Sequence, residues 1–112
     1  MKKIEAIIRS TRFEAVKEEL SKIGINFLTF MDVKGFGKQK EDEVYYRGAV
    51  YDIGYISRMQ IEIVAPDSKV DEVVNTITKA AFTGEFGDGK IFVSNIEKVF
   101  SIRTGEEGEK AL

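Results

Sequence analysis

The sequence predicts an α+β protein in which two helices cover one face of a four-stranded antiparallel sheet. The chain of 112 residues has the length of one domain, so we assign residues 1–112 to a single domain. Segments with alternating apolar residues are interleaved with two segments of helical spacing. Sliding the chain by about 57 positions also aligns segment 4–20 with segment 61–77. Two strand–helix–strand units in tandem predict a split βαβ, or ferredoxin-like, sandwich with the order βαββαβ.

The first unit begins with "KKIEAIIRS", whose alternation places Ile4, Ala6 and Ile8 on one face of a strand. "RFEAVKEELSKIG" changes to helical spacing, and Gly24 is placed to end the helix. The apolar stripe of this helix consists of Phe13, Val16, Leu20 and Ile23. "NFLTFMDVKGF" returns to alternation and predicts the second strand.

The second unit begins with "SRMQIEIVA", a strand closed by Pro66. "DSKVDEVVNTITKAAF" predicts the second helix, where Ser68 and Asp71 resemble a capping arrangement. Its buried stripe consists of Val70, Val73, Val74 and Ile77. "KIFVSNI" predicts the fourth strand, and the C-terminal segment 97–112 reads as a short strand candidate with a loose, charged tail.

The sheet face away from the helices is expected to be bare. Alternation places Ile7, Leu28, Phe30 and Val64 on it. An exposed apolar sheet face is a surface to bury against something, and self-association is the commonest way to do so.

Composition excludes several classes of protein. The chain has no cysteine and no histidine, so disulfides, thiolate chemistry, a Ser-His-Asp triad and a histidine metal site are impossible. The formal net charge of -2 argues against sequence-blind binding to nucleic acid. No apolar run approaches the roughly 20 residues that span a bilayer, and "MKKIEAII" is unlike a signal peptide. We expect a cytoplasmic protein.

The segment "TGEFGDGK" at 83–90 contains the G-x-x-x-x-G-K pattern of phosphate loops. Such a loop follows a strand and opens a helix, whereas this one follows a helix and opens a strand. Ile91 also stands where a phosphate loop has Ser or Thr. The phosphate-loop fold is therefore excluded.

The same segment can still hold an anion by another design. Gly87 and Gly89 free the backbone to present amides in a concave nest, and Lys90 adds a positive charge beside them. The alternative is a plain helix-to-strand turn, in which Gly84 caps the helix and Asp88 begins the turn.

Two further glycine-rich strand ends favour the anion site. "KGFGKQK" surrounds Phe36 with glycines and places Lys34, Lys38 and Lys40 nearby. "SIRTGE" places Arg103 before another glycine. Three such strand ends in a small acidic protein indicate one shared anion site.

The stretches "VKGFGKQK", "YRGAVY", "TGEFGDGKIFVS" and "IRTGEEG" together resemble the PII signal-transduction proteins, the GlnB/GlnK group, over essentially the whole chain. The resemblance implies a homotrimer of ferredoxin-like subunits, with the bare sheet faces lining its interior. It also implies competitive binding of ATP or ADP in clefts between subunits, sensing of 2-oxoglutarate with ATP and Mg²⁺, and regulation of nitrogen metabolism through docking. The family is not enzymatic in its main role.

Carried over position by position, the resemblance implies a nucleotide site. Residues 82–90 match the B-loop, which wraps the phosphates; Thr29 and Val64 match contacts around adenine and ribose; Arg103 matches an arginine supplied by the neighbouring subunit. The full set is Ile7, Thr29, Gly35, Phe36, Gly37, Lys38, Gln39, Val64, Thr83, Gly84, Gly87, Asp88, Gly89, Lys90, Ser101 and Arg103.

This chain departs from the family at two nucleotide positions. Ser101 stands where the family has a second arginine, and losing that charge-assisted bond costs about 1.5–3 kcal/mol. Lys38 stands where an arginine is common, which replaces a bidentate grip with a point charge.

The resemblance implies a 2-oxoglutarate site with Mg²⁺ held by Gln39. Its residues are Gly37, Gln39, Lys40, Glu41 and Arg58. Arg58 replaces a lysine, and Glu41 replaces a glycine whose backbone lies near the ligand. A Cβ and a carboxylate at that place are both unfavourable for a dianion.

Residues 37–56 form a segment too long for a hairpin turn, of the kind that is functional or disordered. Its candidate contact residues for a partner are Tyr45, Tyr46, Arg47, Tyr51 and Tyr55. The resemblance implies that this is the T-loop, which inserts into a target such as an ammonium transporter or a nitrogen-metabolism enzyme. The protein would then reach a membrane only through a partner. Tyr51 matches the tyrosine that some members uridylylate; the alternative is a solvated loop with incidental tyrosines.

Two other functions compete with this prediction. A small ferredoxin-like phosphate-ester or acyl-phosphate hydrolase would use the glycine nests to hold phosphate, but the sequence offers no nucleophile with a base. An RNA-binding sheet would need stacking aromatic residues on its open face.

Overall fold

The computed structural model describes residues 1–36, 43–46, 49–52 and 55–112, and for 43–46, 49–52 and 55 it describes the backbone alone. The strands and α-helices, in chain order, are β1 (Lys2–Arg9), α1 (Phe13–Lys22), β2 (Thr29–Phe36), β3 (Glu43–Tyr46), β4 (Ala49–Asp52), β5 (Tyr55–Ala65), α2 (Val70–Ala81) and β6 (Gly89–Asn95). Short 3-10 turns occupy Ser10–Arg12, Asp67–Lys69 and Gly108–Ala111.

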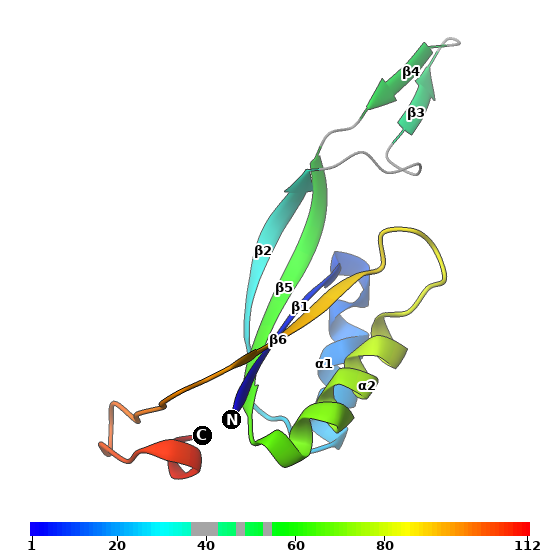
Figure 1. Ribbon diagram of the computed structural model, residues 1–112. Coiled ribbons are helices and arrows are strands. Elements are labelled where there is room, and N and C mark those ends of the chain that lie inside the picture. Colours follow the sequence, from blue (N-terminus) through cyan, green and yellow to red (C-terminus); the bar gives the residue numbers. More distant parts are fainter. Residues whose placement is uncertain (37–42, 47–48, 53–54) are drawn as a thin grey trace.

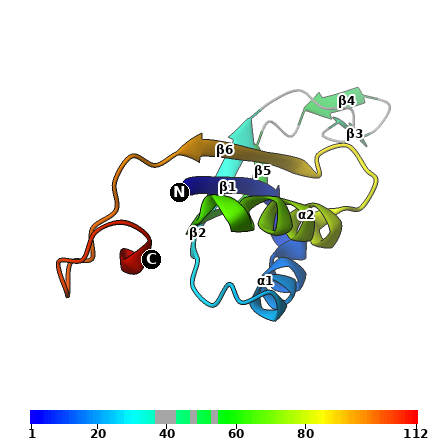
Figure 2. The same ribbon diagram turned by 60° about the horizontal axis from the view of Figure 1, so that its bottom comes forward.

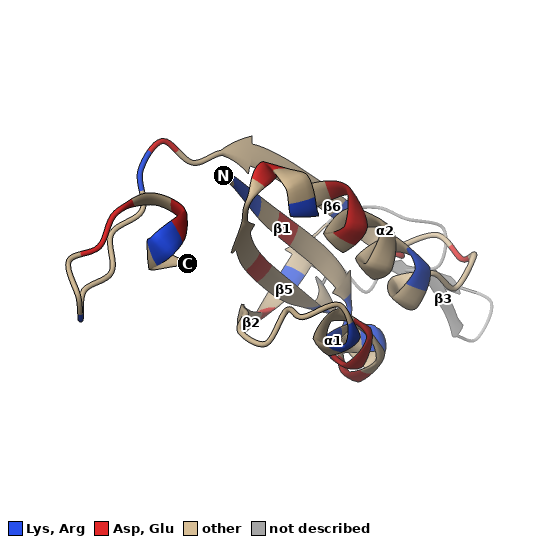
Figure 3. Ribbon diagram, turned by 90° about the horizontal axis from the view of Figure 1, so that it is seen from below, with Lys and Arg blue, Asp and Glu red and all other residues tan. Residues whose placement is uncertain are grey.

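The main sheet has the strand order β2-β5-β1-β6, and each neighbouring pair is antiparallel. Both helices pack on one face of this sheet, as Figure 1 and the turned view in Figure 2 show. The outer surfaces of the helices mix acidic and basic residues (Figure 3), with ion pairs such as Lys17–Glu14 at 2.9 Å. The predicted α+β sandwich with two helices on one sheet face is confirmed.

The core lies between the sheet and the two helices. It consists of Ile4, Ala6, Ile8, Phe13, Val16, Leu20, Ile61, Ile63, Ala65, Val73, Ile77, Ala80 and Ala81. The internal repeat explains its symmetry, because Val16 and Val73 occupy matching places and both are 0% exposed. Gly24 ends α1 as predicted, with a φ of 89° that a residue with a Cβ adopts only at a cost.

The predicted facing of the second strand was wrong. Phe30 pairs with the buried Ile61, so it lies on the helix face, where its ring centroid is 4.7 Å from that of Phe13. Leu28 also packs against the core. Alternation divides a strand into two faces but does not tell which face is covered, and here the pairing with β5 decides it.

The open face carries a different apolar set from β2. Met31 and Val33 pair with Gln60 and Arg58, whose side chains point away from the helices. Ile7 and Val64 lie on the open face as predicted, because they alternate with buried residues in β1 and β5. Phe92 of β6, which is 48% exposed, joins them.

The start of α2 also differs from the prediction. The helix begins at Val70 with no side-chain cap, so Ser68 and Asp71 do not form a capping arrangement. A capping residue needs extended backbone, but Ser68 lies inside the 3-10 turn Asp67–Lys69. The amide of Lys69 donates instead to the carbonyl of Pro66 at 2.9 Å.

Two boundaries are shifted as well. β5 begins at Tyr55, inside the predicted loop 37–56, and the backbone of β3 pairs with that of β4 within this loop. In the C-terminal segment the predicted strand is reduced to one bridge between Phe100 and Glu107. That segment turns through a hydrogen bond from the Gly105 amide to the Ser101 carbonyl at 2.8 Å.

Candidate functional site

A cleft opens where the segment 82–90 meets the open sheet face. Its volume is about 740 Å³. Strands β1, β2, β5 and β6 and the segment before β6 all contribute to its walls. The lining residues are Ile7, Gly35, Arg58, Glu85, Phe86, Gly87, Asp88, Gly89, Lys90 and Phe92. The sequence predicted Ile7, Gly35, Arg58, Gly87, Asp88, Gly89 and Lys90 as site residues, and the fold brings these together.

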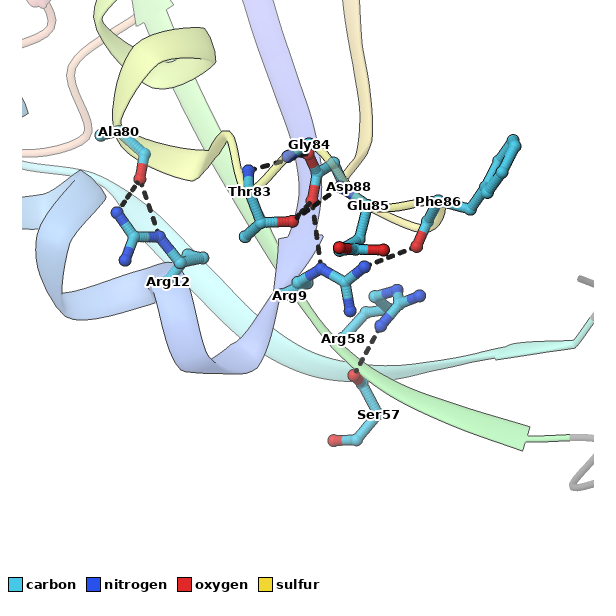
Figure 4. A network of polar contacts seen from close by, with 10 residues as sticks. All are labelled: Arg9, Arg12, Ser57, Arg58, Ala80, Thr83, Gly84, Glu85, Phe86 and Asp88. Carbon is cyan, nitrogen blue, oxygen red and sulfur yellow. Dashed lines mark hydrogen bonds and ion pairs between the residues drawn. The ribbon is translucent and has the colours of Figure 1, made fainter. Parts of the chain in front are cut away.

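Asp88 organises the segment 82–90. Its carboxylate accepts hydrogen bonds from the amides of Thr83, at 2.9 Å, and Gly84, at 3.0 Å, and from the Thr83 hydroxyl (Figure 4). The carboxylate is thus directed onto the beginning of its own loop. Residues 85–90 of this segment line the cleft.

Gly89 allows this loop to lie directly against β1. Its φ is 106°, and a Cβ built there would come 1.8 Å from the carbonyl oxygen of Ile7. Real Cβ atoms do not approach an oxygen so closely, so only glycine fits without a shift of the backbone. The close approach places Lys90, the next residue, beside Ile7 on the open face.

Arg9 is a residue of the site region that the sequence did not point out. Its Nε donates to Asp88 Oδ1 at 3.1 Å, and a terminal nitrogen donates to the Phe86 carbonyl at 2.5 Å (Figure 4). The available signal was its place at the end of β1, on the same face as Ile7. Its partners are 77 and 79 residues away in sequence, so local pattern could not identify them.

The cleft combines cationic, acidic and apolar walls. Arg58 and Lys90 contribute positive charge, Glu85 contributes negative charge, and Ile7 and Phe92 contribute apolar surface. A terminal nitrogen of the Arg58 guanidinium donates a long hydrogen bond to the Ser57 carbonyl oxygen, at 3.5 Å. Such a site suits an anionic ligand that also has an apolar part.

Other predicted site residues lie away from the cleft in this chain. Thr29 and Val64 are on the open face but toward the far end of the sheet, where they pair with Glu62 and Lys3. Ser101 and Arg103 lie in the C-terminal segment, beyond the opposite end of β6 from the segment 82–90 (Figure 1). Thr83 and Gly84 take part through Asp88, and Phe36 ends β2 in a position that is 77% exposed.

Several predictions fall outside the described residues. Gly37, Lys38, Gln39, Lys40, Glu41 and Arg47 are not described, and for Tyr45, Tyr46, Tyr51 and Tyr55 only the backbone is described. Within the described residues, no group of three or more acidic side chains could hold a metal ion. In the same part of the chain, none of the helices is long and apolar enough to span a membrane.

Ser101 has a local role in the turn that carries Arg103. Its hydroxyl accepts a hydrogen bond from the Thr104 amide at 3.3 Å, and its own amide donates to the Glu106 carbonyl at 2.9 Å. Ser101 therefore helps to shape the turn on which Arg103 stands.

Asp88 predicts a specific dependence of stability on pH. The hydrogen bonds from the Thr83 hydroxyl and amide, followed by those from Arg9 and Gly84, hold the pKa of Asp88 well below its usual range. Ionised Asp88 therefore stabilises the folded state above its unfolded pKa, and that contribution is lost as the pH falls through the folded pKa. We expect the Asp88→Asn variant to lose less stability than the parent between about pH 5 and pH 2.

Urea unfolding at a series of pH values measures this difference. Asp71→Asn, at an exposed acid of α2, is the matched control and should follow the parent curve. Parallel curves for the parent and Asp88→Asn would contradict the assignment.

The fold and the cleft define a class of protein: a small α+β domain with a cleft lined by a glycine-rich loop and by the cations Arg58 and Lys90. Comparison with known proteins gives the family. The family model "Nitrogen regulatory protein P-II" matches residues 1–106. The chain is 46% identical to the nitrogen regulatory protein GlnK of Escherichia coli (strain K12) and 48% identical to nitrogen regulatory protein P-II 1 of the same strain, in each case over 100% of both chains. The crystal structure of Arabidopsis thaliana PII bound to citrate superposes with a TM-score of 0.83 at 41% identity, covering 99% of this chain and 91% of that one.

The chain therefore belongs to the P-II family of nitrogen regulatory proteins. The resemblance found in the sequence motifs is confirmed. Family membership assigns the protein a regulatory role in nitrogen signal transduction, not an enzymatic one, and sets aside the hydrolase alternative.

Proposed function

We propose that this protein is a nitrogen and energy-status sensor that binds ATP or ADP in the cleft at the segment 82–90. The observation that carries the proposal is the cleft itself, in which a glycine-rich loop, Lys90 and Arg58 meet an apolar floor. Backbone amides and cations suit the phosphates of a nucleotide, and Ile7 and Phe92 offer apolar surface to its base.

The complete site is proposed to form between the subunits of a homotrimer. Met31, Val64 and Phe92 expose apolar surface on the open sheet face, which favours burial against other copies. Arg103 lies away from the cleft of its own chain, which suits a phosphate contact delivered to a neighbouring subunit. Thr29 and Val64 would contact adenine and ribose from the open face.

A second ligand is proposed to modulate the nucleotide-bound state. Arg58 lines the cleft and would pair with a carboxylate of 2-oxoglutarate, while Mg²⁺ would be held by the ATP phosphates and Gln39. The citrate-bound relative is bound to a polycarboxylate, which agrees with this chemistry. Glu41 opposes a dianion at the predicted place, so we expect a weak response to 2-oxoglutarate.

The output of the sensor is proposed to be the loop 37–56. In this proposal the nucleotide sets its conformation, and Tyr45, Tyr46, Arg47, Tyr51 and Tyr55 contact a target. That target would be an ammonium transporter or a nitrogen-metabolism enzyme, and a cytoplasmic protein would reach the membrane only through the transporter. By linkage, any ligand that changes nucleotide affinity has its own affinity changed by the same factor.

Calorimetry tests the proposal directly. Purified protein is titrated with ATP, ADP and AMP, with and without Mg²⁺ and 2-oxoglutarate, and its mass is measured by light scattering. We expect a trimer that binds ATP and ADP in competition. A monomer that binds no adenine nucleotide would contradict the proposal, whereas nucleotide binding without any effect of 2-oxoglutarate would agree with the role assigned to Glu41.

Glu85 provides a sharper test of where the phosphates bind. Its exposed carboxylate lines the cleft together with Arg58 and Lys90, so it repels an anionic ligand there. We expect Glu85→Gln to raise the affinity for ATP about two- to fivefold at low ionic strength, the size of one exposed charge interaction. The gain should shrink as salt is added.

Glu18→Gln, on the exposed side of α1, is the matched control for Glu85→Gln. It removes the same charge far from the cleft and should leave ATP affinity unchanged. An equal gain from both variants would show a general charge effect and contradict binding at this cleft.

A further inference from the structure

The side chain of Arg9 reaches the loop 82–90 from β1 and hydrogen-bonds to it. Arg9 is the last residue of β1, and its guanidinium donates through Nε to Asp88 and through a terminal nitrogen to the Phe86 carbonyl. The side chains of Arg9 and Asp88 are 26% and 24% exposed, so this pair is mostly shielded from water. A partly buried pair is screened less than one on the surface.

Arg9 contacts the middle and the end of the loop directly and its beginning through Asp88. Asp88 stands just before β6 and accepts the amides of Thr83 and Gly84, which stand just after α2. Phe86 lies at the loop's middle. A continuous set of bonds therefore runs from the sheet through Arg9 to the beginning, middle and end of the loop (Figure 4).

The contact with Asp88 also affects the charge balance between Arg9 and its cross-strand neighbour Arg58. Arg9 is paired directly opposite Arg58 in the β1–β5 register, and both side chains therefore point to the open face. Like charges directly opposite each other destabilise a sheet. Asp88 therefore balances the charge of Arg9 at the place where Arg9 stands opposite Arg58, a residue that lines the cleft.

We propose that Arg9 is a positioning residue, which holds the loop 82–90 in the conformation that presents its amides and Lys90 to a phosphate group. This inference rests on the proposed nucleotide function and adds to it a residue that acts through the loop. An arginine suits this role better than a lysine, because its planar guanidinium reaches a carboxylate and a carbonyl together, while the ammonium of lysine is a single point charge.

Binding measurements with AMP, ADP and ATP test the consequence for the ligand. In Arg9→Met, affinity for ATP should fall about tenfold, the size of one lost charge-assisted interaction. The loss should shrink from ATP through ADP to AMP, because fewer phosphates then meet the loop. Arg9→Lys should lie between the parent and Arg9→Met.

Arg12→Met is the matched control. Arg12 stands three residues further along the chain, and its Nε and a terminal nitrogen both donate to the Ala80 carbonyl at the end of α2, at 3.0 and 2.6 Å. Its loss should lower thermal stability and leave the ATP-to-AMP affinity ratio as in the parent. If Arg9→Met behaves like Arg12→Met, losing stability without changing that ratio, Arg9 is only structural and the inference is wrong.

Amide hydrogen exchange tests the loop without any ligand. In Arg9→Met the amides of Thr83 and Gly84 should exchange faster, by about tenfold, while that of Ile77 inside α2 should be unchanged. Unchanged exchange at Thr83 and Gly84 would overturn the inference. If the parent binds no nucleotide but these amides lose protection in Arg9→Met, the proposed function fails while the positioning of the loop by Arg9 stands.

Discussion

Replacing Gly89 with alanine is expected to destabilise the protein strongly, and by more than the same exchange at Gly24. The backbone at Gly89 has a φ of 106°, and the new Cβ would lie 1.8 Å from the Ile7 carbonyl oxygen. Backbone strain at such a φ costs about 1–3 kcal/mol, and displacing β1 or β6 to relieve the overlap adds a cost of similar size. We expect a total loss on the order of 3–5 kcal/mol, against a typical stability of about 5–15 kcal/mol for a domain.

Urea unfolding of Gly89→Ala and Gly24→Ala separates strain from overlap. Gly24 has a φ of 89° but no atom within 4 Å of a built Cβ, so its replacement adds strain alone. We expect Gly24→Ala to cost roughly 1–2 kcal/mol. Equal losses in the two variants would mean that the loop does not lie against β1 as described. Gly89→Ala should also weaken nucleotide binding if the proposed function holds.

Truncating Ile77 is the second change with a large expected effect. Ile77 is 0% exposed and lies in the core between α2 and the sheet. Removing buried methylene groups loses both the transfer free energy and the contacts around the cavity that remains. We expect Ile77→Ala to lower the free energy of unfolding by about 2–5 kcal/mol and Ile77→Val by about 0.5–1.5 kcal/mol.

Chemical denaturation of the graded pair measures this effect at Ile77. The two variants remove different numbers of atoms from one place, so the loss should increase from valine to alanine. Asn75→Ala is the surface comparison, because the Asn75 side chain is exposed on the same helix. A loss below about 1 kcal/mol for Ile77→Ala would contradict its place in a close-packed core.

Much of the fold could be predicted because its signals are local. The alternation in β1 identified Ile4, Ala6 and Ile8 as the covered face, and all three are buried. Helical spacing identified the buried stripe of α1, and the repeat between the two halves gave the tandem arrangement. These signals can be read from the sequence because a period of two or of 3.6 is a property of neighbouring residues.

The errors arose where a local pattern has two solutions. The strand β2 lies at the edge of the sheet and carries apolar residues on both faces, so its alternation placed Phe30 on the wrong side. At the start of α2 a 3-10 turn replaced the predicted cap at Ser68. In both places the pairing or turn of the backbone, not the residue type, made the choice.

The candidate site was predicted through its glycines and its resemblance to a family, and the fold brought many of those residues into one cleft. Two of its features came only from the tertiary structure. Arg9 contacts a loop almost eighty residues later, and Asp88 turns its carboxylate onto its own loop. Neither contact follows from spacing.

By itself, the sequence determined the order of the four main strands and two helices, the buried stripes, the glycine-rich segment and the family, because each depends on residue types and short spacings. Only the tertiary structure decided which face of β2 is covered, why Gly89 must be glycine, and which cation holds the loop. The physical reason is that these depend on strand register and on contacts between distant segments. Strand pairing brings such segments together, and the local sequence around each segment does not show which distant segment it will contact.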